Sequence, residues 1–248
     1  MIEFKNVSLY YGKNRILKDV SFRCEKGKIT AIIGKNGAGK TSCLKCLMGE
    51  KRFSGEILLE GKDIKALSKI QRAQRISYLS QTLPDTSFTV QELTALGRRP
   101  YQKGVRKLSS EDEEIIRSAM KAAGVISFSE RSVNTLSGGE KQRAYLSMVL
   151  AQETDVIALD EASTYMDAAV ENEMYDIIQS LSRNYGKTII LVTHNLTRMV
   201  NDADEIVVLN EGEVRAQMSS DQARKTSLIE EMFGVKKYVI EGETIVYL

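Results

Sequence analysis

The stretch that most constrains this chain is GKNGAGKT at residues 34–41, which fits the pattern G-x-x-x-x-G-K-[ST]. It follows the β-branched run Ile29–Ile33 and precedes residues with helical spacing, as the pattern requires. Glycines in such a loop let backbone N–H groups point inward at a phosphate, and the N-terminus of the following helix adds partial positive charge. The stretch therefore predicts a binding site for a nucleoside triphosphate.

Two side chains of this loop have predicted chemical roles. Lys40 neutralises the β- and γ-phosphates, and the hydroxyl of Thr41 holds Mg²⁺. The chain has no Asn-Lys-x-Asp stretch of the kind that GTPases use for guanine, so ATP is the favoured nucleotide. The predicted nucleotide-binding residues of the loop and its flank are Gly34, Asn36, Gly37, Ala38, Gly39, Lys40, Thr41 and Ser42.

A second apolar run, Val156–Leu159, ends in the two carboxylates Asp160 and Glu161. Residues at a strand end face different directions, so one carboxylate can meet a metal ion while the other meets an attacking water. We assign Asp160 to Mg²⁺, through a water molecule, and Glu161 to polarising the nucleophilic water. Acidic pairs are also common where turns begin, but the upstream phosphate loop favours the catalytic interpretation.

The charge balance argues against a nucleic-acid partner. The chain has 35 Lys and Arg against 33 Asp and Glu, a net charge of +2, whereas nucleic-acid-binding domains usually carry a strongly basic surface. The longest apolar runs are far shorter than the roughly 18 residues of a membrane span, and the N-terminus lacks the apolar core of a signal peptide. We therefore expect the chain to stay in the cytosol.

The cysteines raise a second possible chemistry, because Cys43 and Cys46 form a C-x-x-C pair. A structural zinc site needs four ligands, and the chain offers no second cysteine pair. Both residues fall in a helical pattern, where positions i and i+3 share a face. We interpret them as small helix-packing residues, and the sparse set of three cysteines as fitting a reducing compartment.

The spacing of apolar residues along the chain changes twice. The N-terminal part reads as short strands near Ile2–Val7, Val20–Arg23, Ile29–Ile33 and Glu56–Leu59. Thr89–Gln152 has helical spacing with Ser or Thr at the starts of its segments. The rest alternates strands with helices, as in a parallel α/β sheet, and the elements expected there are Val156–Leu159, Ala168–Tyr185, Ile189–Thr193, Leu196–Asn201 and Glu205–Leu209.

The segment LSGGEKQR, residues 136–143, opens a helical pattern with Ser137 in the capping position and two glycines in the first turn. This segment resembles the signature of the ATP-binding cassette (ABC) ATPases. The resemblance implies an α/β P-loop NTPase: an ABC ATPase core with a parallel sheet, an N-terminal antiparallel β layer and an inserted helical subdomain. It also implies one domain over 1–248, with the core at 1–86 and 153–248 and the helical signature subdomain at 87–152.

The resemblance assigns further residues in order along the chain. Tyr11 matches the aromatic residue that stacks on adenine, and Gln81 matches the glutamine that links the metal to the helical subdomain. Asp167 matches the loop after the catalytic glutamate, and His194, the one histidine of the chain, matches the switch histidine that contacts the γ-phosphate. Tyr10 and Tyr11 should point to opposite faces of a strand, so at most one can stack on the base.

The resemblance also implies a dimer, in which Ser137, Gly138, Gly139 and Glu140 bind the nucleotide held by the phosphate loop of a second copy. Two chains would then enclose two ATP molecules. Departures from the family pattern, such as Lys35 for proline and Ala162 and Met166 for proline and leucine, remove no catalytic atom. They leave the geometry of 162–167 less defined by the resemblance.

Two segments, SFTVQELTALGRRPYQKG after Gln81 and LIEEMFGVKKYVI near the C-terminus, resemble the ATPase subunits of bacterial importers for iron-siderophores, haem and cobalamin. That resemblance implies a peripheral subunit at the cytoplasmic face of the membrane. Its partners would be membrane-spanning permease subunits, a second ATPase copy and, indirectly, a substrate-binding protein. The basic residues that would face the permease or anionic lipid are Arg98, Arg99, Lys103, Arg106 and Lys107.

Other functions remain open at this point. A solvated basic loop explains the same five basic residues. An ABC ATPase of iron–sulfur cluster assembly would also be one cassette of this size, and an exporter cassette would carry a fused membrane domain or act with a membrane partner. The two segments that resemble importer subunits favour import.

Overall fold

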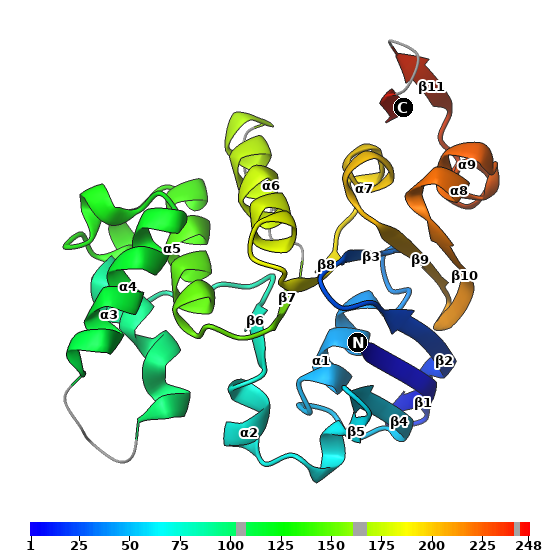
Figure 1. Ribbon diagram of the computed structural model, residues 1–248. Coiled ribbons are helices and arrows are strands. Elements are labelled where there is room, and N and C mark those ends of the chain that lie inside the picture. Colours follow the sequence, from blue (N-terminus) through cyan, green and yellow to red (C-terminus); the bar gives the residue numbers. More distant parts are fainter. Residues whose placement is uncertain (103–107, 161–167, 241–243) are drawn as a thin grey trace. The chain divides into compact units, whose positions relative to one another are not determined.

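The computed structural model describes residues 1–102, 108–160, 168–240 and 244–248, with the backbone alone at 168–170 (Figure 1). The predicted residues Glu161 and Asp167, and the basic residues Lys103, Arg106 and Lys107, lie outside this part. Contacts divide the chain into two compact units, Met1–Leu67 with Gly186–Leu248, and Ser68–Tyr185. The predicted helical subdomain 87–152 falls wholly within the second unit, and its boundaries stay a prediction.

The first unit contains two larger groups of strands and a C-terminal hairpin. The N-terminal antiparallel layer has the order β2-β1-β4-β5. In the second group, of order β10-β9-β3-β8, β3 pairs in parallel with both β8 and β9. The bounds are β1 (Ile2–Tyr11), β2 (Asn14–Cys24), β3 (Ile29–Ile33), β4 (Ser54–Leu59), β5 (Lys62–Asp63), β8 (Thr188–Val192), β9 (Glu205–Asn210) and β10 (Glu213–Ser219).

The antiparallel layer and the parallel strands confirm the predicted fold class. Every residue of β3 and β8 is buried, as expected for parallel strands covered on both faces. The strand expected at Val20–Arg23 is longer than predicted and begins at Asn14. The hairpin turn takes up only Gly12 and Lys13, so Tyr11 already pairs with Asn14.

Helices complete the first unit. α1 (Lys40–Leu47) follows β3, and Cys43 and Cys46 are fully buried in it, as predicted for packing residues. Burial raises the pKa of the Cys46 thiol to about 12, which keeps it protonated and unreactive. The C-terminal part contains α7 (Leu196–Asp202), α8 (Ser220–Lys225), α9 (Leu228–Phe233) and the hairpin of β11 (Lys237–Ile240) and β12 (Thr244–Tyr247).

The second unit combines a parallel strand pair with helices. β6 (Ile76–Leu79) pairs in parallel with β7 (Val156–Asp160). Three helices pack on one another in the green part of Figure 1, as the helical spacing of Thr89–Gln152 predicts. The helices of this unit are α2 (Lys69–Ala73), α3 (Val90–Ala95), α4 (Ser110–Ala122), α5 (Gly138–Ala151) and α6 (Ala168–Arg183). Among the described residues, no helix is both long and apolar enough to cross a membrane.

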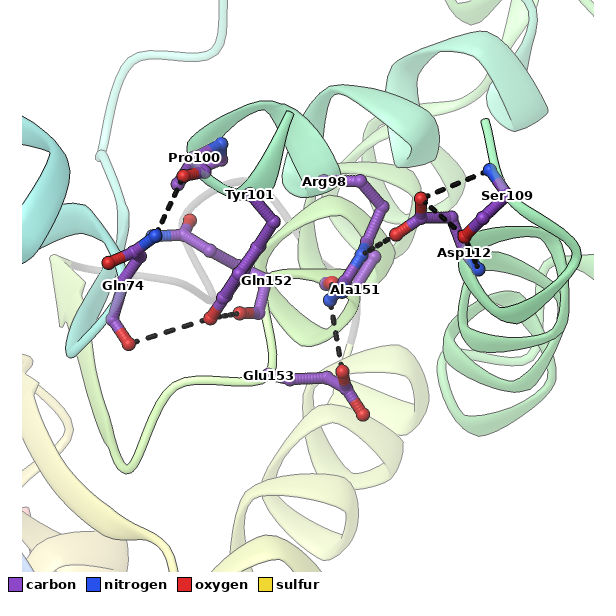
Figure 2. Close-up of polar contacts among 9 residues, drawn as sticks. All are labelled: Gln74, Arg98, Pro100, Tyr101, Ser109, Asp112, Ala151, Gln152 and Glu153. Atoms are coloured by element: carbon purple, nitrogen blue, oxygen red, sulfur yellow. Dashed lines mark hydrogen bonds and ion pairs between the residues drawn. The ribbon is translucent and has the colours of Figure 1, made fainter. Parts of the chain in front are cut away.

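The environment of Arg98 corrects one expectation. This residue was expected on a basic surface, but its side chain is only 7% exposed. Its guanidinium contacts the carboxylates of Asp112 at 2.7 Å and Glu153 at 3.0 Å, and donates to the carbonyl of Ala151 at 2.8 Å (Figure 2). It also lies 4.4 Å from the ring centroid of Tyr101. Residue-type patterns do not reveal such distant acidic partners, so the sequence suggested exposure.

Arg98 therefore stabilises the junction between α4 and the end of α5. Replacing it with methionine in Arg98→Met leaves the largely buried Asp112 carboxylate without its cation, and we expect the free energy of unfolding to fall by about 3 kcal/mol. Because Arg98 lowers the pKa of Asp112, the contribution is present above the ordinary carboxyl pKa of about 4 and is lost as the pH falls below it.

Urea unfolding at pH 7 measures the effect. Glu153→Gln is the matched control, because the Glu153 side chain is 52% exposed and its removal costs less than about 1 kcal/mol. Equal losses in the two variants would contradict a stabilising role centred on Asp112.

Candidate functional site

The phosphate loop connects β3 to α1 in the first unit, as the sequence predicts. Gly37 and Gly39 have φ values of +81° and +102°, in the region that favours glycine. At Gly34, a Cβ atom would lie 2.3 Å from the carbonyl oxygen of Leu209, so only glycine fits there without a backbone shift. The loop is thus a narrow, glycine-dependent turn at the start of α1, and the N-terminus of a helix after such a turn suits a phosphate group.

Lys40 lies over this loop. The residue is 6% exposed, and its ammonium donates to the carbonyl of Gly34 at 2.8 Å and to that of Lys35 at 3.3 Å. A buried cation at the N-terminus of a helix suits a polyphosphate. Thr41 follows in the first turn of α1, where its hydroxyl is the predicted Mg²⁺ ligand.

His194 lies at the carboxyl ends of the same parallel strands as the phosphate loop. β3 and β8 are neighbouring parallel strands in which Ile32 pairs with Val192, so Gly34 and His194 each stand two residues beyond a matched pair. His194 is exposed, and the next residue, Asn195, caps α7 by accepting from the N–H of Arg198 at 3.0 Å. The structure therefore brings His194 to the strand ends that hold the loop.

The two candidate adenine-stacking residues end β1. The rings of Tyr10 and Tyr11 are both accessible, at 54% and 41% exposed. The guanidinium of Arg15 lies 5.9 Å from the ring centroid of Tyr10, and the ammonium of Lys51 lies 5.1 Å from that of Tyr11. Because both rings are available to a base, stacking on Tyr11 stays a prediction.

In the second unit, Asp160 and Gln81 follow neighbouring strands. Asp160 ends β7 and is 1% exposed, and Gln81 stands two residues beyond β6 and is exposed. β6 and β7 run in parallel, with Leu79 opposite Leu159, so these two side chains belong to the same strand edge. The phenol of Tyr78 donates to Oδ2 of Asp160 at 3.1 Å. The residue assignments from the sequence did not include this tyrosine.

The signature segment begins α5, as predicted. The hydroxyl of Ser137 accepts from the N–H of Glu140 at 3.4 Å, and the N–H of Ser137 donates to the Glu140 carboxylate at 2.8 Å. The second bond holds the pKa of that carboxyl below its ordinary value. Ser137 and Gly138 are exposed at this helix N-terminus, and Gly139 is half-buried. Glu140 therefore serves as a capping residue within the chain, while nucleotide contact by this segment stays a prediction.

Within the first unit, a glycine-dependent loop between a parallel strand and a helix, with a buried lysine over it, defines a P-loop nucleotide-binding protein. The comparisons identify the family. The model of the ABC transporter family matches residues 17–164, and the chain belongs to this family. Two curated relatives are the petrobactin import ATP-binding protein FpuD of Bacillus anthracis and the ferric enterobactin transport ATP-binding protein FepC of Escherichia coli (strain K12).

The similarity to these relatives extends over most of each chain. FpuD is 36% identical across 94% of this chain and 86% of its own, and FepC is 35% identical across 96% and 88%. Among solved structures, an Atm1-family ABC exporter with ATP bound has a TM-score of 0.80 at 26% identity, covering 94% of this chain and 41% of its own. A dimeric post-hydrolysis state of the cassette MJ0796 shares the fold, with a TM-score of 0.79 at 24% identity. The match covers 89% of this chain and 99% of the MJ0796 chain.

The choice between the two tyrosines is testable. We expect Tyr11→Ala to weaken ATP binding about 3- to 10-fold, because one aromatic stacking contact contributes about 0.5–1.5 kcal/mol. Tyr10→Ala removes the neighbouring exposed ring and should leave the ATP affinity within about twofold of the wild type. Titration with a fluorescent ATP analogue measures both. A loss in Tyr10→Ala alone would transfer the stacking role to Tyr10.

Proposed function

We propose that this chain is the ATP-hydrolysing subunit of an ABC importer for an iron–siderophore complex or a related metal chelate. The observation that carries the ATPase part is the glycine-dependent loop with Lys40 buried over it, since this arrangement suits a nucleoside triphosphate. The import part is supported by relatives such as FpuD and FepC, whose names specify petrobactin import and ferric enterobactin transport.

Lys40 neutralises phosphate charge, and its hydrogen bonds to Gly34 and Lys35 keep the ammonium at the loop. His194 contacts the γ-phosphate from the adjoining strand end, and Tyr11 stacks on adenine. Asp167, from the loop after the acidic pair, belongs to the same proposed nucleotide site. Glu161 polarises the water that attacks the γ-phosphate.

The oxygen donors assigned to Mg²⁺ fit that ion. The Thr41 hydroxyl, the Gln81 amide and the Asp160 carboxylate are hard ligands of the kind that Mg²⁺ prefers, and the carboxylate of Asp160 is buried at its strand end. When bound, Mg²⁺ neutralises charge that develops on the β- and γ-phosphates. We propose that these three residues hold it, with Asp160 acting through a water molecule.

We further propose that two copies bind two ATP molecules. Ser137, Gly138 and Gly139 of each copy contact the γ-phosphate held by the other. The exposure of Ser137 and Gly138 at the N-terminus of α5 supports this arrangement, because backbone N–H groups there attract anions. Closure of such a pair, followed by hydrolysis and product release, gives permease subunits a cycle of two states at the cytoplasmic face of the membrane.

The importer assignment is tested by what binds this chain in its native cell. Mild cross-linking, detergent extraction and mass spectrometry of the captured complex should recover a polytopic membrane protein together with this chain. The same procedure without the cross-linker and with excess detergent is the control for adventitious capture. Recovery of soluble iron–sulfur assembly proteins alone would contradict import and leave the ATP site as assigned.

A further inference from the structure

The pairing register of β6 and β7 places Tyr78 beside Asp160, the carboxylate predicted to act on Mg²⁺. In the parallel pair of β6 and β7, Tyr78 stands opposite Ala158, so their side chains share a face. Asp160 lies two residues beyond Ala158 on the same strand and shares that face too. The phenol therefore points along the strand edge at Asp160, and it donates to Oδ2 at 3.1 Å.

The chemistry of this hydrogen bond is directional. In it the phenol of Tyr78 is the donor and a carboxylate oxygen of Asp160 the acceptor. Tyr78 is half-buried and Asp160 is 1% exposed, so water competes weakly for the bond. A donor to one carboxylate oxygen fixes the rotation of the group about its terminal bond. The one other hydroxyl on these two strands makes a different contact, because Ser77 accepts from the buried Thr154 hydroxyl at 2.8 Å.

We propose that Tyr78 is a positioning residue for the nucleotide-bound metal ion, because its phenol holds the Asp160 carboxylate in the orientation that receives a water ligand of that ion. This inference rests on the proposed ATPase function and on the assignment of Asp160. Partners that orient a metal ligand typically contribute about 10- to 100-fold to metal affinity. Asp160 acts through a water molecule, so the contribution of Tyr78 belongs at the lower end of that range.

The experiment measures metal binding rather than turnover. Wild-type protein saturated with a non-hydrolysable ATP analogue is titrated with Mn²⁺, and free Mn²⁺ is followed by electron paramagnetic resonance. Tyr78→Phe removes only the phenol oxygen, and we expect its Mn²⁺ affinity to fall about 10-fold. The affinity for the analogue in the presence of EDTA should match the wild type, because Tyr78 has no assigned contact with the nucleotide.

Two controls separate the possible results. Tyr101→Phe removes another phenol of the same unit, one that donates to the carbonyl of Gln152 at 2.8 Å, and should leave Mn²⁺ affinity unchanged. Asp160→Asn should lower Mn²⁺ affinity at least as much as Tyr78→Phe. If Asp160→Asn weakens Mn²⁺ binding and Tyr78→Phe does not, the positioning role is wrong while the metal assignment stands. If Asp160→Asn also has no effect, the assignment of Asp160 itself is wrong.

A general loss of packing would give a different pattern. It would lower the thermal midpoint and the EDTA-state nucleotide affinity of Tyr78→Phe together with its Mn²⁺ affinity. That joint loss would overturn the proposal, because a positioning residue changes metal affinity selectively.

Discussion

The close approach of the phosphate loop to the neighbouring strand is the constraint on which the rest of the site depends. The Cα of Gly34 faces the carbonyl of Leu209 on β9, at a distance that leaves no room for a side chain. A backbone hydrogen bond from the N–H of Gly212 to the carbonyl of Ala38 at 3.1 Å holds another part of the loop. The loop is therefore built against the sheet, and Lys40 is buried over a backbone that cannot easily move.

Parallel strand pairing determines which of the predicted site residues lie close together within each unit. Because parallel strands end at one edge, β3 and β8 bring the phosphate loop and His194 together, and β6 and β7 bring together the residues that follow them, Gln81 and Asp160. Most side chains within these strands are buried and apolar, with Thr30, Ser77 and Thr188 as buried polar exceptions, whereas His194 and Gln81 stand just past the strand ends and are exposed. The strands thus place most of the apolar core within them and the proposed nucleotide-binding residues at or beyond their ends.

Much of this arrangement was predictable from the sequence, because its signals are local. The glycine spacing of the phosphate loop, the serine cap of α5 and the apolar run before Asp160 each lie within a few consecutive residues. What the sequence did not reveal depends on distant partners. The burial of Arg98 follows from Asp112 and Glu153, and the bond from Tyr78 to Asp160 follows from strand register between segments 82 residues apart. The C-terminal hairpin of β11 and β12 was also not predicted.

The central claim is that the loop at residues 34–41 binds ATP and that Lys40 supplies the charge for it. The most direct measurement is the ATP affinity of the purified chain by calorimetry, compared with that of Lys40→Ala and of Lys35→Ala, which changes an exposed lysine of the same loop. The account predicts a loss of about 100-fold in Lys40→Ala, as expected for removal of a buried charged hydrogen-bond donor, and a much smaller change in Lys35→Ala. Equal affinities in wild type and Lys40→Ala would contradict it.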